Sequence, residues 1–419
     1  MERTEFRPRE LFKREQLEKI FPQDSADASW NIGIIAIHGN EPQRLVAAVS
    51  LEINEILKDH HLRGPVLVLP DIYGESSKRI LSEEFPNNLD EIFISGELGR
   101  ILRQTEFGSA GYQVHMREVA QNQPKVYEQV LENLSRPFLA TSLAGRTQEF
   151  SPSGRRLEIN AGANVAASAP DEKRTHFYFP VVLSELVQGI LEDNDINFTY
   201  DLKTLETVLK YAQDLEKTYL STQLGYIHTF SFRESYDANG KILTPAPKKY
   251  KTPPSIEIKN GIYIMASGSG IGVDVVTNQA KKLSQEGYQI VCPPWMNLDF
   301  ATIASPEAIF HPGVKAVIGR AGWGILWDAQ KAGKPFADIG SGEYDNPEIR
   351  FNRKSIIRAG MGKAFSLRRD FIEELAELSP NIENLNRQIE KDLNLPANYD
   401  GTRFAAENIL QVEVNRQIQ

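Results

Sequence analysis

The stretch Val314–Asn352, VKAVIGRAGWGILWDAQKAGKPFADIGSGEYDNPEIRFN, decides the fold of this chain. It opens with a short apolar run, Ala316–Ile318, of the kind that forms a buried parallel strand. A glycine-punctuated turn at 319–324 leads into a helical segment, Ile325–Lys331, and a second apolar run, Phe336–Ile339, follows. Strand, glycine turn, helix and strand in this order predict one unit of a parallel α/β sheet.

The glycine turn predicts an anion site. A strand that ends in glycines and turns straight into a helix directs backbone N–H groups and the positive end of the helix dipole at one point. That point suits a diphosphate held by the turn around Arg320, Gly322 and Gly324. We expect Asp328, one turn into the helix, to accept hydrogen bonds from a sugar diol. The alternative is a tight strand–helix turn with a solvated acid.

The spacing of these residues resembles that of a known family. Arg-x-Gly is followed by an acid six residues after the glycine, then by x4-Gly-x-Pro, and later by an acid shortly before Phe-Asn. This pattern resembles the donor half of GT-B glycosyltransferases. It is most similar to the branch of the peptidoglycan UDP-N-acetylglucosamine transferase and the diacylglycerol glycosyltransferases, and the match is clearest over residues 257–363. The resemblance implies an α/β protein of two doubly wound, Rossmann-like domains that face each other across a cleft.

A second glycine turn, formed by Ser267, Gly268, Ser269 and Gly270, follows the first strand of the predicted donor domain. In the resembling family this turn faces the donor diphosphate. A dinucleotide fingerprint is disfavoured, because the glycines run G-x-G-x-G and the next strand ends at Cys292 without an acid for a ribose. A simple tight turn is the remaining alternative.

The resemblance implies three further sites. Trp323, inside the first turn, is expected to pack on the donor or to fill part of its pocket. Glu348 and Asn352 fall where the family places groups that contact the sugar hydroxyls. An inverting transfer also needs a general base near the acceptor hydroxyl, and His38 and Glu41, which follow an early apolar run, are the candidates. The alternative for His38 is a structural histidine at a strand end.

The pattern along the chain predicts three parts. Residues 1–250 are expected to form an acceptor-side α/β domain, in which the Ser- and Gly-rich stretch 146–176 is a long loop. Residues 255–370 are expected to form the nucleotide-sugar-binding domain. The helices predicted in 371–419 should pack back towards the first domain, as the last helices of GT-B enzymes do.

Composition narrows the function. The net charge of −9 over 419 residues argues against broad nucleic-acid binding. Cys292 is the only cysteine, so no intrachain disulfide can form and a cytoplasmic location fits. No apolar run of 18 residues is present, and the charged start does not resemble a signal peptide. Pairs of arginines in the sequence could bind lipid headgroups, so peripheral membrane contact stays an open alternative.

We therefore predict an inverting, metal-independent hexosyltransferase that uses a nucleotide-sugar, UDP-sugar by default, and no further cofactor. The D-x-D sequence at 193–195, typical of a metal clamp, ends a predicted helix in the wrong half of the chain. Two alternatives stay open. One is a degenerate GT-B protein that binds a ligand or partner without catalysis, and the other is an enzyme similar to UDP-sugar 2-epimerases. The acceptor, which can be a small molecule, a lipid or a glycan, is not specified.

Overall fold

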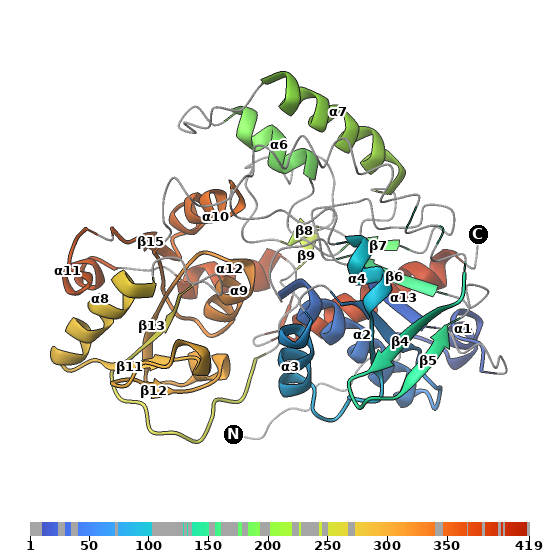
Figure 1. Ribbon diagram of the computed structural model, residues 1–419, viewed down its shortest axis with the longest axis horizontal. Helices are drawn as coiled ribbons and strands as arrows, with labels where there is room; N and C mark the ends of the chain where they lie inside the picture. The colour runs from blue at the N-terminus through green and yellow to red at the C-terminus, as the bar shows by residue number, and fades with distance from the viewer. Residues whose placement is uncertain are drawn as a thin grey trace.

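The computed structural model describes most of the chain, and the statements below concern the residues 11–23, 30–34, 41–71, 74–102, 129, 132, 136–150, 156–160, 175–177, 183–192, 202–219, 226–227, 243–244, 250–266, 273–339, 347–366, 368–378, 382–392, 395–396 and 399–416. Two large sheets lie side by side with helices around each (Figure 1).

The first sheet has seven strands within the described residues, in the order β5-β4-β3-β2-β1-β6-β7. Strands β3, β2, β1, β6 and β7 run parallel, and β4 and β5 form an antiparallel edge. The chain order is β1 (Trp30–Ile34), α2 (Glu41–Asp59), β2 (Val66–Pro70), α3 (Glu75–Glu84), β3 (Ile92–Ser95), α4 (Gly96–Leu102), β4 (Phe138–Ser142), β5 (Thr147–Phe150), β6 (Arg156–Asn160) and β7 (Thr175–Phe177).

The apolar patterns explain these elements. β2 is almost wholly buried, as expected for a strand of a parallel sheet that is covered on both faces. On α2, Leu45, Val49, Ile53 and Ile56 recur at helical spacing and are at most 3% exposed. The helix therefore covers one face of the sheet with a continuous apolar stripe.

The prediction that 146–176 is a long loop is wrong for the described residues of this stretch, 146–150, 156–160 and 175–176. The stretch contains β5, β6 and the start of β7, and β6 pairs with β1 along five residues, from Trp30↔Arg156 to Ile34↔Asn160. Leu157 and Ile159 are buried on one face of β6. Their two-residue alternation was the available signal, but it is short and flanked by Gly, Ser and Asn.

The second sheet has six parallel strands within the described residues, in the order β12-β11-β10-β13-β14-β15. The chain order is β10 (Gly261–Met265), α8 (Val273–Gln285), β11 (Gln289–Cys292), η6 (Pro294–Met296), β12 (Thr302–Ile303), η7 (Pro306–Phe310), β13 (Val314–Gly319), α9 (Trp323–Lys331), β14 (Phe336–Asp338), α10 (Pro347–Arg358) and β15 (Gly362–Ala364). This is the strand order of a doubly wound Rossmann-like sheet. The predicted fold class is confirmed.

Two helices lie apart from both sheets. α6 (Leu183–Glu192) and α7 (Leu202–Tyr219) pack against each other (Figure 1). α6 also reaches α10 of the second sheet, where Gly189 leaves room for the ring of Phe351: an added Cβ would lie 3.1 Å from its Cζ. The short strands β8 (Tyr226–Ile227) and β9 (Leu243–Thr244) pair with each other.

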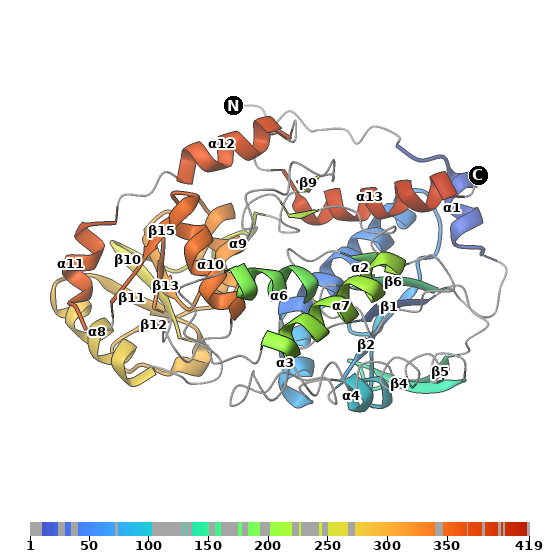
Figure 2. The same cartoon turned by 90° about the horizontal axis from the view of Figure 1, so that it is seen from above.

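The last helices run from the second sheet back to the first. α11 (Phe371–Ala376) packs on α8, and α12 (Ile382–Asp392) packs on α9. α13 (Gly401–Arg416) lies along α2 and reaches α1 (Arg14–Ile20) (Figure 2). Arg403 Nη1 of α13 lies 3.1 Å from Glu52 Oε1 of α2. In the described part of the chain, no helix combines the length and apolarity needed to cross a bilayer.

Candidate functional site

The second sheet has one point where the strand order reverses, between β10 and β13. The chain leaves β10 through α8 towards β11 on one side, and leaves β13 through α9 towards β14 on the other. Ligands of open α/β sheets bind outside the carboxyl ends of the strands at such a point. The loop after β10, which holds Ser267, Gly268, Ser269 and Gly270, lies outside the described residues. The turn after β13 is described.

The turn after β13 is short and ends in the N-terminus of α9. The Gly322 N–H donates to the Arg320 carbonyl at 2.7 Å, which closes a three-residue turn centred on Ala321. Gly322 is the N-cap residue, with φ −79° and ψ 148°, and it has no side chain to cap the helix. An α-helix leaves its first N–H groups without intrahelical partners. The start of α9 therefore supplies N–H donors and a positive dipole end at the switch point.

Ala321, at the centre of this turn, is held by two buried side chains. Its N–H donates to Asp338 Oδ1 at 2.8 Å, and its carbonyl accepts from Asn352 Nδ2 at 2.7 Å. Both Asp338 and Asn352 have 0% exposure. Asp338 Oδ2 forms an ion pair with Arg353 Nε, which comes from the same helix as Asn352. The hydrogen bonds from the end of β14 and from α10 therefore fix the conformation of the turn.

The burial of Asn352 corrects its predicted role. We expected its amide to contact sugar hydroxyls of a donor, but the side chain is closed to solvent and bonded to the Ala321 backbone. Glu348, expected in the same role, lies in the first turn of α10, and its side chain is outside the described residues.

The residues around the turn differ in exposure. Arg320 is half-buried, and it is a cationic side chain at the turn itself. Trp323 is 5% exposed and its ring centroid lies 5.5 Å from that of Trp327. Trp323 and Gly324 thus both belong to the buried part of α9, and the Trp323 ring fills the interior of the domain.

Asp328 does not lie where a ribose diol can reach it. Its side chain is 2% exposed, on a helix that is buried from Trp323 to Gln330. Burial lowers the pKa of Lys251 and raises that of Tyr263, and the negative charge of Asp328 helps to raise the pKa of both. The predicted ribose contact is therefore not supported by this structure, because the carboxylate is enclosed by the packing around α9.

Asp328 belongs to a cluster of charges that joins the two sheets. Lys251 Nζ lies 3.3 Å from Glu84 Oε1 of α3 and 3.1 Å from Glu307 Oε1 of η7. Glu84 also forms an ion pair with Arg44 of α2. Burial lowers the pKa of Lys251, but the attraction of Asp328, Glu84 and Glu307 outweighs it and the net pKa is raised. Burial raises the pKa of Glu307, and the attraction of Lys251 outweighs it, so the net pKa is lowered.

Sequence reasoning missed Asp338, Arg353 and Lys251. Asp338 carried a usable signal, because an acid inside the apolar run Phe336–Ile339 has to find partners when the strand is buried. Nothing in the sequence distinguished Lys251, since it is one of three lysines within Lys248–Lys251.

The first sheet offers a second candidate region. Its strand order reverses between β1 and β6, and α2 begins at Glu41 directly after the loop that follows β1. His38 in that loop and the side chain of Glu41 lie outside the described residues. The buried Gln43 of α2 donates to the Pro70 carbonyl at the end of β2, at 3.0 Å.

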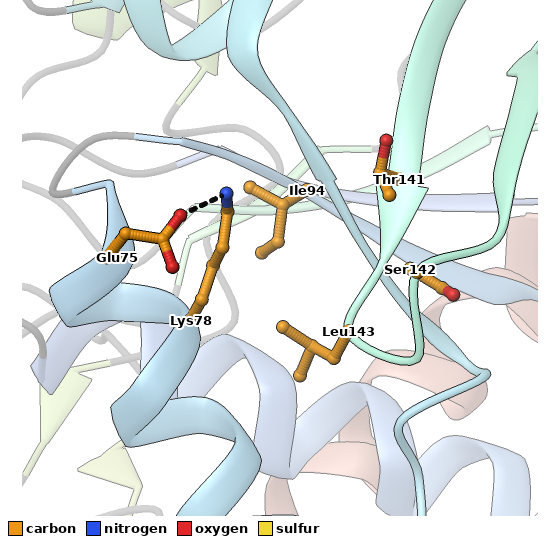
Figure 3. A pocket seen from close by; sticks show the side chains of 7 residues that line it. Glu75, Lys78, Ile94, Thr141, Ser142 and Leu143 are labelled. Atoms are coloured by element: carbon orange, nitrogen blue, oxygen red, sulfur yellow. Dashed lines mark hydrogen bonds and ion pairs between the residues drawn. The ribbon is translucent and has the colours of Figure 1, made fainter.

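A small hollow of about 280 Å³ lies beside α3 and the β3–β4 pair (Figure 3). Its lining includes Ile94, Thr141 and the ion pair between Lys78 and Glu75, at 2.9 Å. No lining residue comes from the second sheet, so this hollow is separate from the turn after β13. Within the described residues, no group of three or more His, Cys, Asp or Glu side chains is placed to hold a metal ion.

Comparisons with known proteins bear on the fold. No protein-family model matches the sequence, and no curated protein matches it. A UDP-glucosyltransferase from Polygonum tinctorium aligns over 93% of this chain and 99% of its own, with a TM-score of 0.56 and 12% identity. The calicheamicin glycosyltransferase CalG4 aligns over 93% and 100%, with a TM-score of 0.56 and 11% identity. UGT71G1 of Medicago truncatula, solved with UDP-glucose, aligns over 93% and 99%, with a TM-score of 0.51 and 12% identity.

At these identities the similarity establishes the fold. Nearly the whole chain matches nearly the whole of each of these structures, including both sheets. The chain therefore has the GT-B architecture of two Rossmann-like α/β units.

Proposed function

We propose that the protein is a glycosyltransferase that moves a sugar from a nucleotide-sugar to an acceptor. The observation that carries this proposal is the placement of a capless helix N-terminus and its glycine turn at the switch point of the second sheet. A diphosphate at this point would meet N–H donors, the helix dipole and the cationic side chain of Arg320. The shared architecture with solved UDP-sugar glycosyltransferases supports a UDP-sugar as the donor.

The chemistry follows from the leaving group. When the bond between the anomeric carbon and the diphosphate oxygen breaks, negative charge develops on the diphosphate. Fixed N–H donors at the start of α9 and Arg320 would stabilise that charge without reorganising. We propose direct displacement with inversion and without a metal, with Ser267, Gly268, Ser269 and Gly270 on the second side of the diphosphate.

The general base would come from the first sheet. We propose His38 and Glu41, which follow β1 in the sequence, because β1 lies at the switch point of that sheet, where an acceptor hydroxyl would be deprotonated as it attacks. The spacing of Arg320 and Gly322 in the sequence is our ground for proposing a donor of the type used by the UDP-N-acetylglucosamine and diacylglycerol branch.

A second candidate function is ligand binding without turnover. The burial of Asp328 and Asn352 favours it, because both positions were expected to contact the donor and neither side chain is open to one in this structure. A protein that keeps the diphosphate turn but lacks these contacts would bind a nucleotide and transfer nothing.

The first experiment is thermal stabilisation against UDP, GDP, ADP, TDP, CMP, NAD and their common sugars. A ligand at 100 times its dissociation constant stabilises the folded state by about 2.7 kcal/mol, which is a shift of several degrees. We expect a shift with UDP that Arg320→Ala abolishes and that Arg387→Ala, an exposed arginine on α12, retains. No shift with any nucleotide would rule out the transferase.

Release of UDP from UDP-sugar separates the two candidates. Slow hydrolysis or transfer to an added acceptor supports the enzyme, and binding without any release supports the non-catalytic protein.

We also propose a cytoplasmic location, because the single cysteine, Cys292, is buried and needs no oxidising compartment. Peripheral membrane contact is a further proposal, and flotation with anionic liposomes tests it.

A further inference from the structure

Three polar side chains, those of Asp338, Asn352 and Arg353, are gathered at the glycine turn. Asp338 is the last residue of β14 and pairs in register with Gly319, the last residue of β13. Asn352 and Arg353 are consecutive on α10, and Arg353 is 24% exposed. Asp338 and Asn352 bind the two polar backbone groups of Ala321, and Arg353 binds Asp338.

Stability alone gives little reason for this arrangement. A fully buried carboxylate costs free energy unless an opposite charge and hydrogen bonds compensate it. Apolar residues of similar volume are often as stable as a buried ion pair, or more so. Here each oxygen of Asp338 has a separate partner, Oδ1 the Ala321 N–H and Oδ2 the Arg353 guanidinium. The arrangement fixes a single backbone geometry at one residue, Ala321.

We propose that Asp338, Asn352 and Arg353 are positioning residues for the diphosphate, an inference that rests on the function proposed above. They hold Ala321 so that the first turn of α9 directs its N–H groups at the ligand, while the Gly322 N–H closes the turn on the Arg320 carbonyl. Gly322 needs this support, because a glycine without a Cβ samples many backbone conformations. Arg353 also neutralises Asp338, which would otherwise place a negative charge close to a bound diphosphate.

The effect should be specific to the diphosphate part of the ligand. Asp338 and Asn352 bind the Ala321 turn, which we propose to hold the diphosphate, so the nucleoside part should bind equally well without these bonds. The experiment is calorimetric titration of the whole protein with UDP and, separately, with uridine. Loss of one orienting hydrogen bond predicts a roughly tenfold weaker UDP affinity in Asn352→Leu, with uridine affinity unchanged.

Asn54→Leu is the matched control. Asn54 is also a buried asparagine, 5% exposed, and its Nδ2 donates to the Pro65 carbonyl at 2.9 Å, but in the first sheet's domain. Both substitutions remove a bond from an asparagine Nδ2 to a backbone carbonyl, and Asn54→Leu also removes a longer bond to Glu91 Oε2, at 3.4 Å. We expect Asn54→Leu to lower thermal stability and to keep the wild-type ratio of UDP to uridine affinity.

Substitutions of Asp338 and Arg353 test whether the ion pair between these two side chains affects UDP affinity. Asp338→Asn keeps an oxygen that accepts from the Ala321 N–H, so its UDP affinity should stay nearer the wild type than that of Asp338→Leu. Arg353→Gln leaves the carboxylate uncompensated, and its UDP affinity should fall severalfold while uridine binding is kept. Because Arg353 is partly exposed, this variant tests the same contact if the buried variants do not fold.

The proposal is overturned if folded Asn352→Leu, Asp338→Leu or Arg353→Gln keeps the wild-type ratio of UDP to uridine affinity. It is also overturned if UDP and uridine affinities fall together. A wild-type protein that binds UDP no better than uridine contradicts the proposed function itself, and that result is visible before any variant is made.

Discussion

Replacing Lys251 by Met should destabilise the protein where its two sheets meet. The side chain is 14% exposed and its Nζ lies within 3.3 Å of carboxylates from both sides, Glu84 and Glu307. Met has a similar volume and no charge, so the variant leaves these carboxylates and that of Asp328 without their common cation. Breaking a fully buried pair costs 3–5 kcal/mol, and partial exposure of the partners reduces this to roughly 2–3 kcal/mol. For a unit of 150–250 residues the melting temperature falls by roughly 4–12 °C.

The assay is thermal unfolding of both proteins from pH 7 down to about pH 3. The pKa of Glu307 is lowered in the folded state, so its stabilisation is complete above the unfolded value of 4.5 and is lost as the pH falls through the lowered pKa. The difference between the wild type and Lys251→Met should therefore be largest near neutral pH and shrink in acid.

Lys58→Met is the matched control for this prediction. Lys58 also contacts two carboxylates, Glu55 at 2.8 Å and Glu91 at 3.5 Å, but its side chain is 49% exposed. Water screens such a pair, so the cost should stay below about 0.5 kcal/mol. Equal losses in the two variants would refute the reasoning, because they would mean that burial between the sheets adds nothing to the ion pairs.

Three further predictions concern pH, the thiol and a close backbone contact. Burial lowers the pKa of Lys331 to about 8, below the unfolded value of 10.5, so the unfolded chain retains a proton that the folded protein loses. Stability in urea should therefore rise by up to about 3 kcal/mol between pH 8 and 10.5 relative to Lys331→Met. Burial raises the pKa of the Cys292 thiol, so a thiol reagent should react with the protein only as it unfolds, and rapid labelling of the folded protein would contradict this. A Cβ at Gly362 would lie 1.7 Å from the Phe336 carbonyl oxygen, so Gly362→Ala should express poorly, whereas Gly96→Ala, where nothing lies within 4 Å, should express as the wild type does.

Local patterns predicted most of the regular elements. The apolar run Ala316–Ile318 lies in β13, and the helical segment Ile325–Lys331 lies in α9, which begins two residues earlier. Such segments are long or apolar enough to be recognised alone. β6 was missed because its pairing with β1, more than a hundred residues away, decides its structure. Two buried residues among polar neighbours do not reveal that partner.

The sequence predicted the position of the glycine turn but not the surroundings of the side chains near it, because those surroundings depend on residues far away in the sequence. Glycine spacing after an apolar run located the turn at 319–324, because backbone geometry there depends on the turn residues themselves. Whether Asp328 and Asn352 face a ligand or the interior depends on what packs over them. For Asp328 the neighbours include Lys251, and for Asn352 the backbone of Ala321, which lie far from each in sequence. The spacing of residues in a sequence shows which residue types occur at which positions, but it does not show where their side chains point.

One helix, α9, connects the candidate donor site with the contact between the two sheets. Its N-terminus forms the turn at the switch point, and Asp328, less than two turns further on, acts electrostatically on Lys251. Lys251 in turn pairs with Glu84 of the first sheet's domain and Glu307 of the second. The C-terminal end of α9 holds the chain that returns to the first sheet, because Asn386 Nδ2 donates to the Gln330 carbonyl at 2.9 Å. Within the described residues, α9 therefore contributes both to the turn at the switch point and to contacts that lead to the first sheet.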